Sequence, residues 1–148
     1  MAETLSVPVD LQELARVYGW VDEVSDRFEL PRACRVVLQI VVEEAVSNII
    51  RHGFPNAPPA PEDRINLAMD DDTAWVTLRI DDNGIPFDPH SVPTPQRAAT
   101  LEDMQPGGQG IHLIRRRTAA MDYARRDGRN WLALRIAHAP AMTAPAAA

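Results

Sequence analysis

The chain has 148 residues, of which 45% are hydrophobic and 24% charged, and this composition predicts one ordinary globular domain. Its formal net charge of −6 argues against a nucleic-acid partner, because phosphate backbones bind basic surfaces. No segment approaches the roughly 20 apolar residues of a membrane span, and the N-terminus lacks a signal-peptide pattern, so we expect no membrane partner and a cytoplasmic location.

The N-terminal segment predicts a strand followed by a helix. Leu5–Val9 alternates apolar and polar residues, and Pro8 restricts such a strand to the edge of a sheet. Asp10 then offers a helix N-cap, with Glu13 three residues later. Apolar residues recur at helical spacing from there to Phe28, which predicts the first helix.

A second helix is expected between Pro31 and Gly53, because proline is favoured in a first turn and glycine just after a last one. Cys34 lies on the apolar face of this helix. As the single cysteine it cannot form an internal disulfide, and we expect it to be an inert core thiol. A proline-rich loop, residues 55–61, follows.

Two strands and a long loop come next. Apolar residues alternate over 65–69, and an acidic turn separates this strand from a second one, Trp75–Asp81. Residues 84–109 show little periodicity. Loops of that length inside a compact domain are usually lids or binding segments, so we expect this loop to be functional.

The C-terminal part predicts a third helix, Ile111–Met121, and then a hairpin. Tyr123–Arg126 and Asn130–Ile136 flank Asp127-Gly128, a dipeptide typical of tight hairpin turns. Residues 138–148 are rich in alanine and proline, and we expect them to form a disordered tail.

The order of these elements indicates the fold class. We expect residues 1–137 to form one α+β domain, a two-layer sandwich. Its sheet should be mixed, mostly antiparallel, and covered on one face by the helices.

Two polar side chains of the second helix lie on one side of its apolar stripe. At 100° per residue, Asn48 falls roughly 60° and Glu44 roughly 100° from the centre of the stripe. Glu43 and Ser47 fall on the far side and are expected to face water. Half-buried polar groups need partners, such as a metal ion or a substrate. Taken alone, however, the pattern is more typical of an interior hydrogen-bonded pair or a solvated helix margin.

Two glycine-containing segments add to this pattern. Asp82-Asn83-Gly84 follows a strand, where an aspartate can accept a hydrogen bond from a ligand and a glycine permits close approach, although such turns are common. Gly107-Gly108-Gln109-Gly110 precedes the third helix, and a helix N-terminus favours phosphate. Such a glycine-rich stretch can also be simply a flexible hinge. The chain contains no lysine, so this segment is not a P-loop.

In this order and spacing, the three segments resemble the N, G1 and G2 boxes of the GHKL (Bergerat-fold) ATPases. The strings that carry the resemblance are V-E-E-A-V-S-N-I-I-R-H-G-F, D-D-N-G-I-P-F-D-P and G-G-Q-G-I-H-L-I. Within that superfamily the sequence looks like the RsbW/SpoIIAB-like anti-sigma-factor serine/threonine kinases. The similarity extends from about Leu5 to Ile136, and it implies the Bergerat ATP-binding fold with ATP and Mg²⁺ as cofactors.

The resemblance implies a role for each matching residue. Asn48 would coordinate Mg²⁺, and Glu44 would be the general base. Asp82 would recognise the adenine amino group, and Gly84 would let base and ribose sit close to the backbone. Asn130 stands where many relatives carry threonine beside the adenine.

The resemblance also assigns the phosphate end of the site. Gly108 and Gly110 would wrap the phosphates with backbone N–H groups, and residues 86–107 would form the ATP lid. Because the chain has no lysine, Arg51, Arg97 or Arg115 is a candidate for a phosphate contact, and the sequence does not choose among them.

The function implied is a partner-switching regulator with serine kinase activity toward a STAS-type anti-sigma-factor antagonist, which would also sequester a sigma factor. The alternative is a nucleotide-dependent protein-binding module without efficient phosphoryl transfer. A histidine-kinase catalytic domain is disfavoured, because the sequence leaves no room for a dimerising helix pair with its phospho-accepting histidine. Regulators of this kind commonly form homodimers, and the first strand and helix are the candidate interface.

Overall fold

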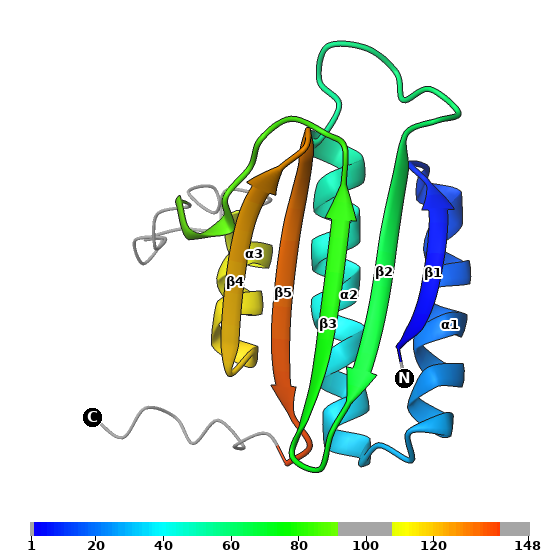
Figure 1. Cartoon of the computed structure of the whole chain (residues 1–148), viewed down its shortest axis with the longest axis vertical. Coiled ribbons are helices and arrows are strands. Elements are labelled where there is room, and N and C mark those ends of the chain that lie inside the picture. The colour runs from blue at the N-terminus through cyan, green and yellow to red at the C-terminus, as the bar shows by residue number, and fades with distance from the viewer. Residues whose placement is uncertain (1, 92–107, 140–148) are drawn as a thin grey trace, which may run out of the picture.

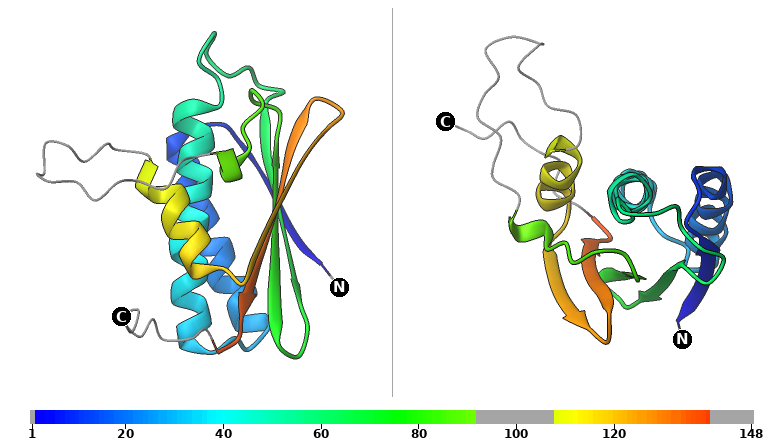
Figure 2. Two further views of the ribbon diagram at one scale, coloured as in Figure 1. Left: turned by 90° about the vertical axis from the view of Figure 1, so that its left-hand side faces the viewer. Right: turned by 90° about the horizontal axis from the view of Figure 1, so that it is seen from above.

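The computed structural model describes residues 2–91 and 108–139, which form a five-stranded sheet with helices packed on one of its faces (Figures 1 and 2). The strands are β1 (Glu3–Pro8), β2 (Arg64–Asp71), β3 (Trp75–Asp82), β4 (Ala120–Arg126) and β5 (Arg129–Ala137). The helices are α1 (Leu14–Arg27), α2 (Arg32–His52) and α3 (Gly108–Arg117), with short 3₁₀ turns η1 (Leu11–Glu13) and η2 (Pro89–Ser91).

The strand order is β1-β2-β3-β5-β4, and every pairing among the described residues is antiparallel. The predicted α+β sandwich is therefore confirmed, with an antiparallel sheet in place of the mixed one expected. β1 forms one edge, as Pro8 requires. The β4–β5 hairpin turns at Asp127 and Gly128, whose φ angles of 53° and 71° are the left-handed values of a two-residue hairpin turn.

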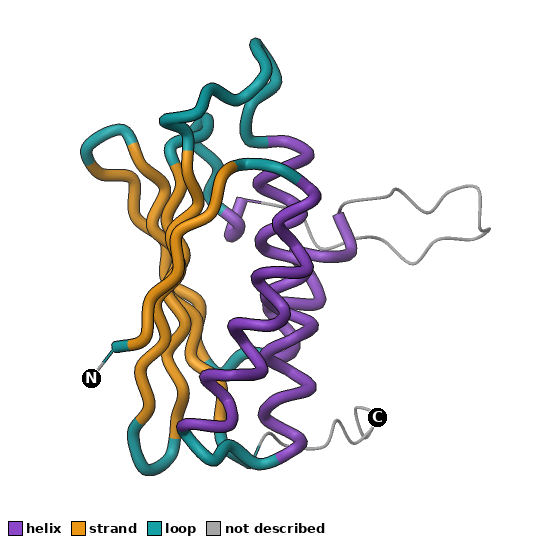
Figure 3. The backbone as a smooth tube through the Cα atoms, turned by 90° about the vertical axis from the view of Figure 1, so that its right-hand side faces the viewer, coloured by secondary structure: helices purple, strands orange, loops and turns teal. Residues whose placement is uncertain are grey.

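The core lies between the sheet and the helices (Figure 3). Alternate residues of β2 and β3 point into it, because successive side chains of a strand face opposite sides. Cys34 is fully buried, and burial raises the pKa of its thiol to about 11, so the predicted core thiol is confirmed. The largest fully buried side chains are Leu38, Ile65, Leu67, Met69, Leu78, Ile80, Ile114, Leu134 and Ile136.

The helix α2 runs along the middle of the helical layer, between α1 and α3 (Figure 2). Pro31 is its N-cap rather than its first helical residue. Gly53 ends the helix as predicted, and its N–H donates to the Ile49 carbonyl at 2.8 Å. Because the sheet and two helices pack against it, α2 is covered on more sides than a helix at the edge of a layer.

The third helix differs from its prediction at both ends. It begins at Gly108, so Gly108 and Gly110 lie in its first turn and not in a preceding loop. It ends at Arg117, because Ala119 donates to the Arg135 carbonyl at 2.8 Å and the chain then pairs with β5. Met121, expected to end the helix, belongs to β4 and pairs with Leu134.

Parts of two predicted segments lie outside the described residues. These are 92–107 of the expected lid and 140–148 of the expected tail. The first residue of that expected tail, His138, donates its backbone N–H to the Ala74 carbonyl at 3.0 Å. None of the described helices is both long and apolar enough to cross a membrane.

Candidate functional site

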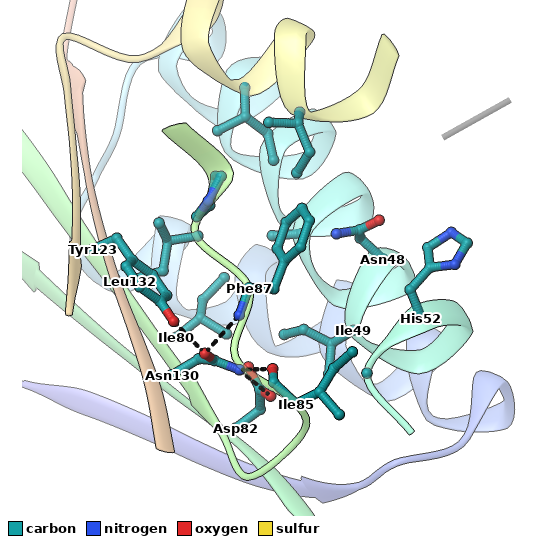
Figure 4. Close-up of a pocket in the computed structure, with 15 residues that line it drawn as sticks. Asn48, Ile49, His52, Ile80, Asp82, Ile85, Phe87, Tyr123, Asn130 and Leu132 are labelled. Carbon is teal, nitrogen blue, oxygen red and sulfur yellow. Dashed lines mark hydrogen bonds between the residues drawn. The ribbon is translucent and has the colours of Figure 1, made fainter. Parts of the chain in front are cut away.

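A pocket opens where β3 ends beside the C-terminal half of α2, and the β4–β5 hairpin and α3 close its other sides (Figure 4). Its surface is mostly apolar, with a few polar side chains, which is the usual make-up of small-molecule sites. Its non-polar and aromatic lining comprises Ala45, Ile49, Gly53, Ile80, Ile85, Phe87, Pro89, Ile111, Ile114, Tyr123 and Leu132. The polar lining comprises Asn48, His52, Asp82 and Asn130.

Asp82 is the last residue of β3, one position later than the predicted strand end, and its exposed fraction is only 5%. Its Oδ1 accepts from the Gly84 backbone N–H at 2.9 Å and from Asn130 Nδ2 at 3.1 Å. Burial raises the pKa of the Asp82 carboxyl, and these two hydrogen bonds oppose that rise. No hydrogen bond from the described residues reaches Oδ2, so this oxygen is available to a donor on a ligand.

Gly84 lies in the turn after β3, and this turn packs against Gly53 at the end of α2. A Cβ on Gly84 would lie 2.7 Å from the Gly53 carbonyl oxygen and 3.1 Å from Gly53 Cα. The next residue, Ile85, donates its N–H to the same carbonyl at 2.9 Å. Glycine is therefore favoured at 84 because two backbones touch there, and Gly53 on one side of the contact lines the pocket.

Asn48 and Glu44 lie one turn apart on α2, and both are half-buried, as the helical spacing predicts. The Asn48 side chain lines the pocket (Figure 4). Glu44 lies beside the first turn of α3, where a Cβ on Gly110 would come within 2.1 Å of Glu44 Oε2. The structure therefore brings the N-box carboxylate against the G2 glycine, a contact that links two segments far apart in the sequence.

The other side of α2 agrees with the prediction at one residue and contradicts it at another. Glu43 is exposed, as expected. Ser47, also expected to face water, has an exposed fraction of only 5%. Its small side chain stays close to its own helix, with the hydroxyl 3.4 Å from the Glu44 carbonyl oxygen.

The start of the expected lid is attached to the hairpin and to α3. The two ring nitrogens of His90 lie 2.8 Å from Asp88 Oδ1 and from the Met121 carbonyl oxygen. Arg115, a candidate phosphate ligand, donates to the Pro89 carbonyl at 2.7 Å. Arg51 is exposed on α2. The third candidate, Arg97, lies outside the described residues.

The described residues hold no cluster of three or more His, Cys, Asp or Glu side chains that could bind a metal ion by itself. Asn48, the residue expected to bind Mg²⁺, would offer a single amide oxygen from α2. Such a sparse set suits Mg²⁺, which usually keeps several waters and shares phosphate oxygens rather than filling an all-protein cage.

Sequence reasoning missed most of the contacts around Asn130, which is buried on β5 opposite Asp82. Its amide bonds Asp82 and the Ile85 carbonyl, and Tyr123 bonds to Asn130 in turn (Figure 4). The inward alternation of the hairpin residues could have placed Asn130 and Tyr123 on the helix-covered face of the sheet. It could not have identified their partners, because these depend on the register between β3 and β5.

Comparisons with known proteins agree with this geometry. Residues 7–136 match the family described as the histidine kinase-like ATPase domain. The chain is also 34% identical, over 138 residues, to the serine/threonine-protein kinase BtrW of Bordetella bronchiseptica. That alignment covers 93% of this chain and 95% of the Bordetella protein. The matched region contains all three helices, the strands from β2 to β4, nearly all of β5 and the whole pocket lining. The chain therefore belongs to the histidine kinase-like ATPase domain family, a family whose name implies the use of ATP.

Proposed function

We propose that this protein is an ATP-dependent serine kinase that phosphorylates a STAS-type antagonist protein and also sequesters a sigma factor. The observation that carries the proposal is the contact between Glu44 and Gly110 at the first turn of α3. This contact places the Glu44 carboxylate beside the N-terminus of α3. A helix N-terminus is a favourable site for phosphate. The similarity to a protein named as a serine/threonine kinase supports the same conclusion.

The proposed site divides the nucleotide between two ends of the pocket. Asp82 accepts a hydrogen bond from the adenine amino group at the buried end. The backbone N–H groups at Gly108 and Gly110 bind the phosphates at the other end. In the transfer step, the serine oxygen bonds to the γ-phosphorus while the bond to the bridging oxygen of ADP breaks. Glu44 accepts the hydroxyl proton.

Asn48 is the proposed protein ligand of Mg²⁺. Its amide lines the pocket one helical turn beyond Glu44, on the side of α2 that faces α3 and the sheet. When bound there, Mg²⁺ neutralises charge on the phosphates. Because the chain supplies so few oxygen ligands, most of the coordination would come from water and phosphate oxygens.

The proposal also concerns the partners of the protein and its location. A net charge of −6 fits protein partners better than nucleic acid. A homodimer would use β1, the edge strand, together with the neighbouring α1. A cytoplasmic location stays a prediction.

The test is phosphoryl transfer from labelled ATP to a STAS-domain protein of the same organism, with Mg²⁺ present. Glu44→Gln should lower the transfer rate by about a hundredfold or more, since it removes a general base. ATP affinity should stay within a factor of about three, because the change does not touch the base subsite. Glu43→Gln is the matched control, because this neighbouring carboxylate is exposed, and it should leave the rate unchanged.

Two other results would contradict the kinase assignment. Equal losses in the Glu44 and Glu43 variants would show that Glu44 has no special role. Tight ATP binding with no transfer to any STAS protein would favour the alternative, a nucleotide-dependent protein-binding module. Calorimetry with Asn48→Ala would separate the metal contact, because this variant should weaken ATP binding only when Mg²⁺ is present.

A further inference from the structure

The Asn130 side chain uses every hydrogen-bonding position that it has. An asparagine amide has two N–H donors and an oxygen that accepts two hydrogen bonds. Asn130 Nδ2 donates to Asp82 Oδ1 at 3.1 Å and to the Ile85 carbonyl at 2.8 Å. Its Oδ1 accepts from the Phe87 N–H at 3.2 Å and from the Tyr123 hydroxyl at 2.5 Å (Figure 4).

These bonds connect three separate parts of the chain at one buried point. The exposed fraction of Asn130 is 7%, and it lies directly opposite Asp82 in the β3–β5 register. Ile85 and Phe87 belong to the segment that leads from β3 toward η2, and Tyr123 comes from β4. Buried polar networks of this kind hold one geometry when every member is satisfied.

A saturated amide has no donor or acceptor left for a nucleotide base. Asn130 can therefore act on a base only through the group that it holds. That group is the Asp82 carboxylate, whose Oδ1 is bound by Asn130 and by the Gly84 N–H. With Oδ1 held from two sides, the carboxylate cannot rotate, and Oδ2 keeps one fixed direction.

We propose that Asn130 is a positioning residue for base recognition, which fixes the Asp82 carboxylate so that Oδ2 meets the amino group of adenine. The inference rests on the proposed ATP site. The same bonds tie the segment through Phe87 to the base subsite, so the base end of the pocket and the start of the expected lid share one anchor. Selectivity for a 6-amino purine over a 6-oxo purine then depends on Asn130 as well as on Asp82, because a 6-oxo group offers Oδ2 no donor.

The experiment measures binding of ATP and GTP to the full chain by calorimetry over a range of pH. Asn130→Ala should lower ATP affinity by about tenfold, since it removes every hydrogen bond that the amide makes to Asp82 and its neighbours. The ratio of ATP to GTP affinity should fall with it. Asn66→Ala is the matched control, because Asn66 donates to Asp81 at 3.0 Å from a strand position that does not line the pocket. It should change neither value.

The pH profile separates positioning from a merely structural role. Adenine needs the ionised carboxylate as an acceptor, and the Asn130 hydrogen bond lowers the pKa of Asp82. Loss of that bond should raise the pKa of Asp82, so ATP binding by Asn130→Ala should fail at a higher pH than binding by the wild type. A structural defect alone would weaken binding by the same factor at every pH.

Tyr123→Phe serves if Asn130→Ala does not fold. It removes only the hydroxyl that donates to Asn130 Oδ1, and it should shift affinity and pH profile in the same direction by a smaller factor. Unchanged affinity ratio and pH profile in either folded variant would overturn the inference while the ATP site stands. If Asp82→Asn also left ATP binding unchanged, the proposed site itself would be wrong, and the inference would fall with it.

Discussion

The two ends of the pocket are built on different physical terms. At the proposed base end, Asp82 and Asn130 are buried, and the protein itself makes all the hydrogen bonds that Asn130 can form. At the proposed phosphate end, Asn48 and Glu44 are half-buried, and no side-chain hydrogen bond to either is present within the described residues. Under our proposal the base end is organised before a ligand arrives, whereas the phosphate end needs the nucleotide and its metal to complete it.

The difference indicates a division of work. A rigid polar subsite gives selectivity, because a wrong base leaves buried groups without partners. A phosphate end with few fixed bonds can rearrange while a phosphoryl group moves and a partner protein approaches. Substitutions at the two ends should therefore have different effects on stability and on binding, and the predictions below use that difference.

Asp82→Asn should have the largest effect, a loss of about a hundredfold in ATP affinity, because a hydrogen bond to a charged group is lost. Stability should change in the opposite direction, rising by roughly 1 kcal/mol at neutral pH, because a buried charge is removed. Asparagine can still accept the Asn130 hydrogen bond through its own side-chain oxygen.

The stability gain should also depend on pH. The folded protein raises the pKa of Asp82, so it binds a proton more tightly than the unfolded chain does. The contribution of Asp82 to the unfolding free energy of the wild type is therefore present at acidic pH, and it is lost as the pH rises through the pKa of Asp82 in the folded protein. The advantage of Asp82→Asn should disappear on acidification, which urea unfolding at several pH values will measure. A constant advantage, or a destabilised variant, would contradict this account.

Gly84→Ala should be the second largest change. The new methyl would meet the backbone of Gly53, which cannot move as a side chain can. Overpacking of this kind costs about 1–3 kcal/mol of unfolding free energy. Because the new methyl would also lie 2.9 Å from Asp82 Oδ1, at the proposed base subsite, affinities for adenosine and for ATP should fall by the same factor. Thermal unfolding and calorimetry with both ligands will test this, and a selective loss of ATP binding would refute it.

The sequence predicted the two ends unequally. Helical spacing placed Glu44 and Asn48 on one side of α2, because such spacing depends only on helix geometry. The same spacing wrongly predicted that Ser47 faces water. It assumes that a helix is covered on one face only, whereas α2 packs against the sheet and both neighbouring helices. Helical spacing also could not predict the approach of Gly110 to Glu44, because that contact depends on where α3 begins and how it packs.

The base end shows the same limit. Asp82 was found from the turn that follows it, a local signal. The hydrogen bond from Asn130 joins residues that are 48 positions apart, and only the register of β3 with β5 brings them together. Local chemistry therefore singled out the candidate ligand-facing groups, and tertiary pairing decided which groups hold them.

Gly110→Ala should have a smaller effect, confined to the phosphate end. The atoms nearest to its methyl would belong to the flexible Glu44 side chain, with Oε2 closest at 2.1 Å, and this side chain can move away. Unfolding free energy should therefore change by less than about 1 kcal/mol. ATP affinity or transfer rate should fall by about tenfold while adenosine binding stays unchanged, because Glu44 is displaced from the first turn of α3. Equal losses for ATP and adenosine would show that the two ends are not independent.

Gly19→Ala should have the smallest effect, and it calibrates the others. Gly19 lies exposed within α1, and a Cβ there would have no neighbour within 4 Å. The substitution should stabilise the protein by about 0.5–1 kcal/mol through helix propensity alone, with no change in ATP or adenosine affinity. Subtracting this gain from the Gly110→Ala result isolates the cost of moving Glu44, since both glycines lie in helices. If Gly19→Ala altered nucleotide binding, α1 would be coupled to the pocket, and the stability effects at Gly84 and Gly110 could no longer be assigned to their local contacts.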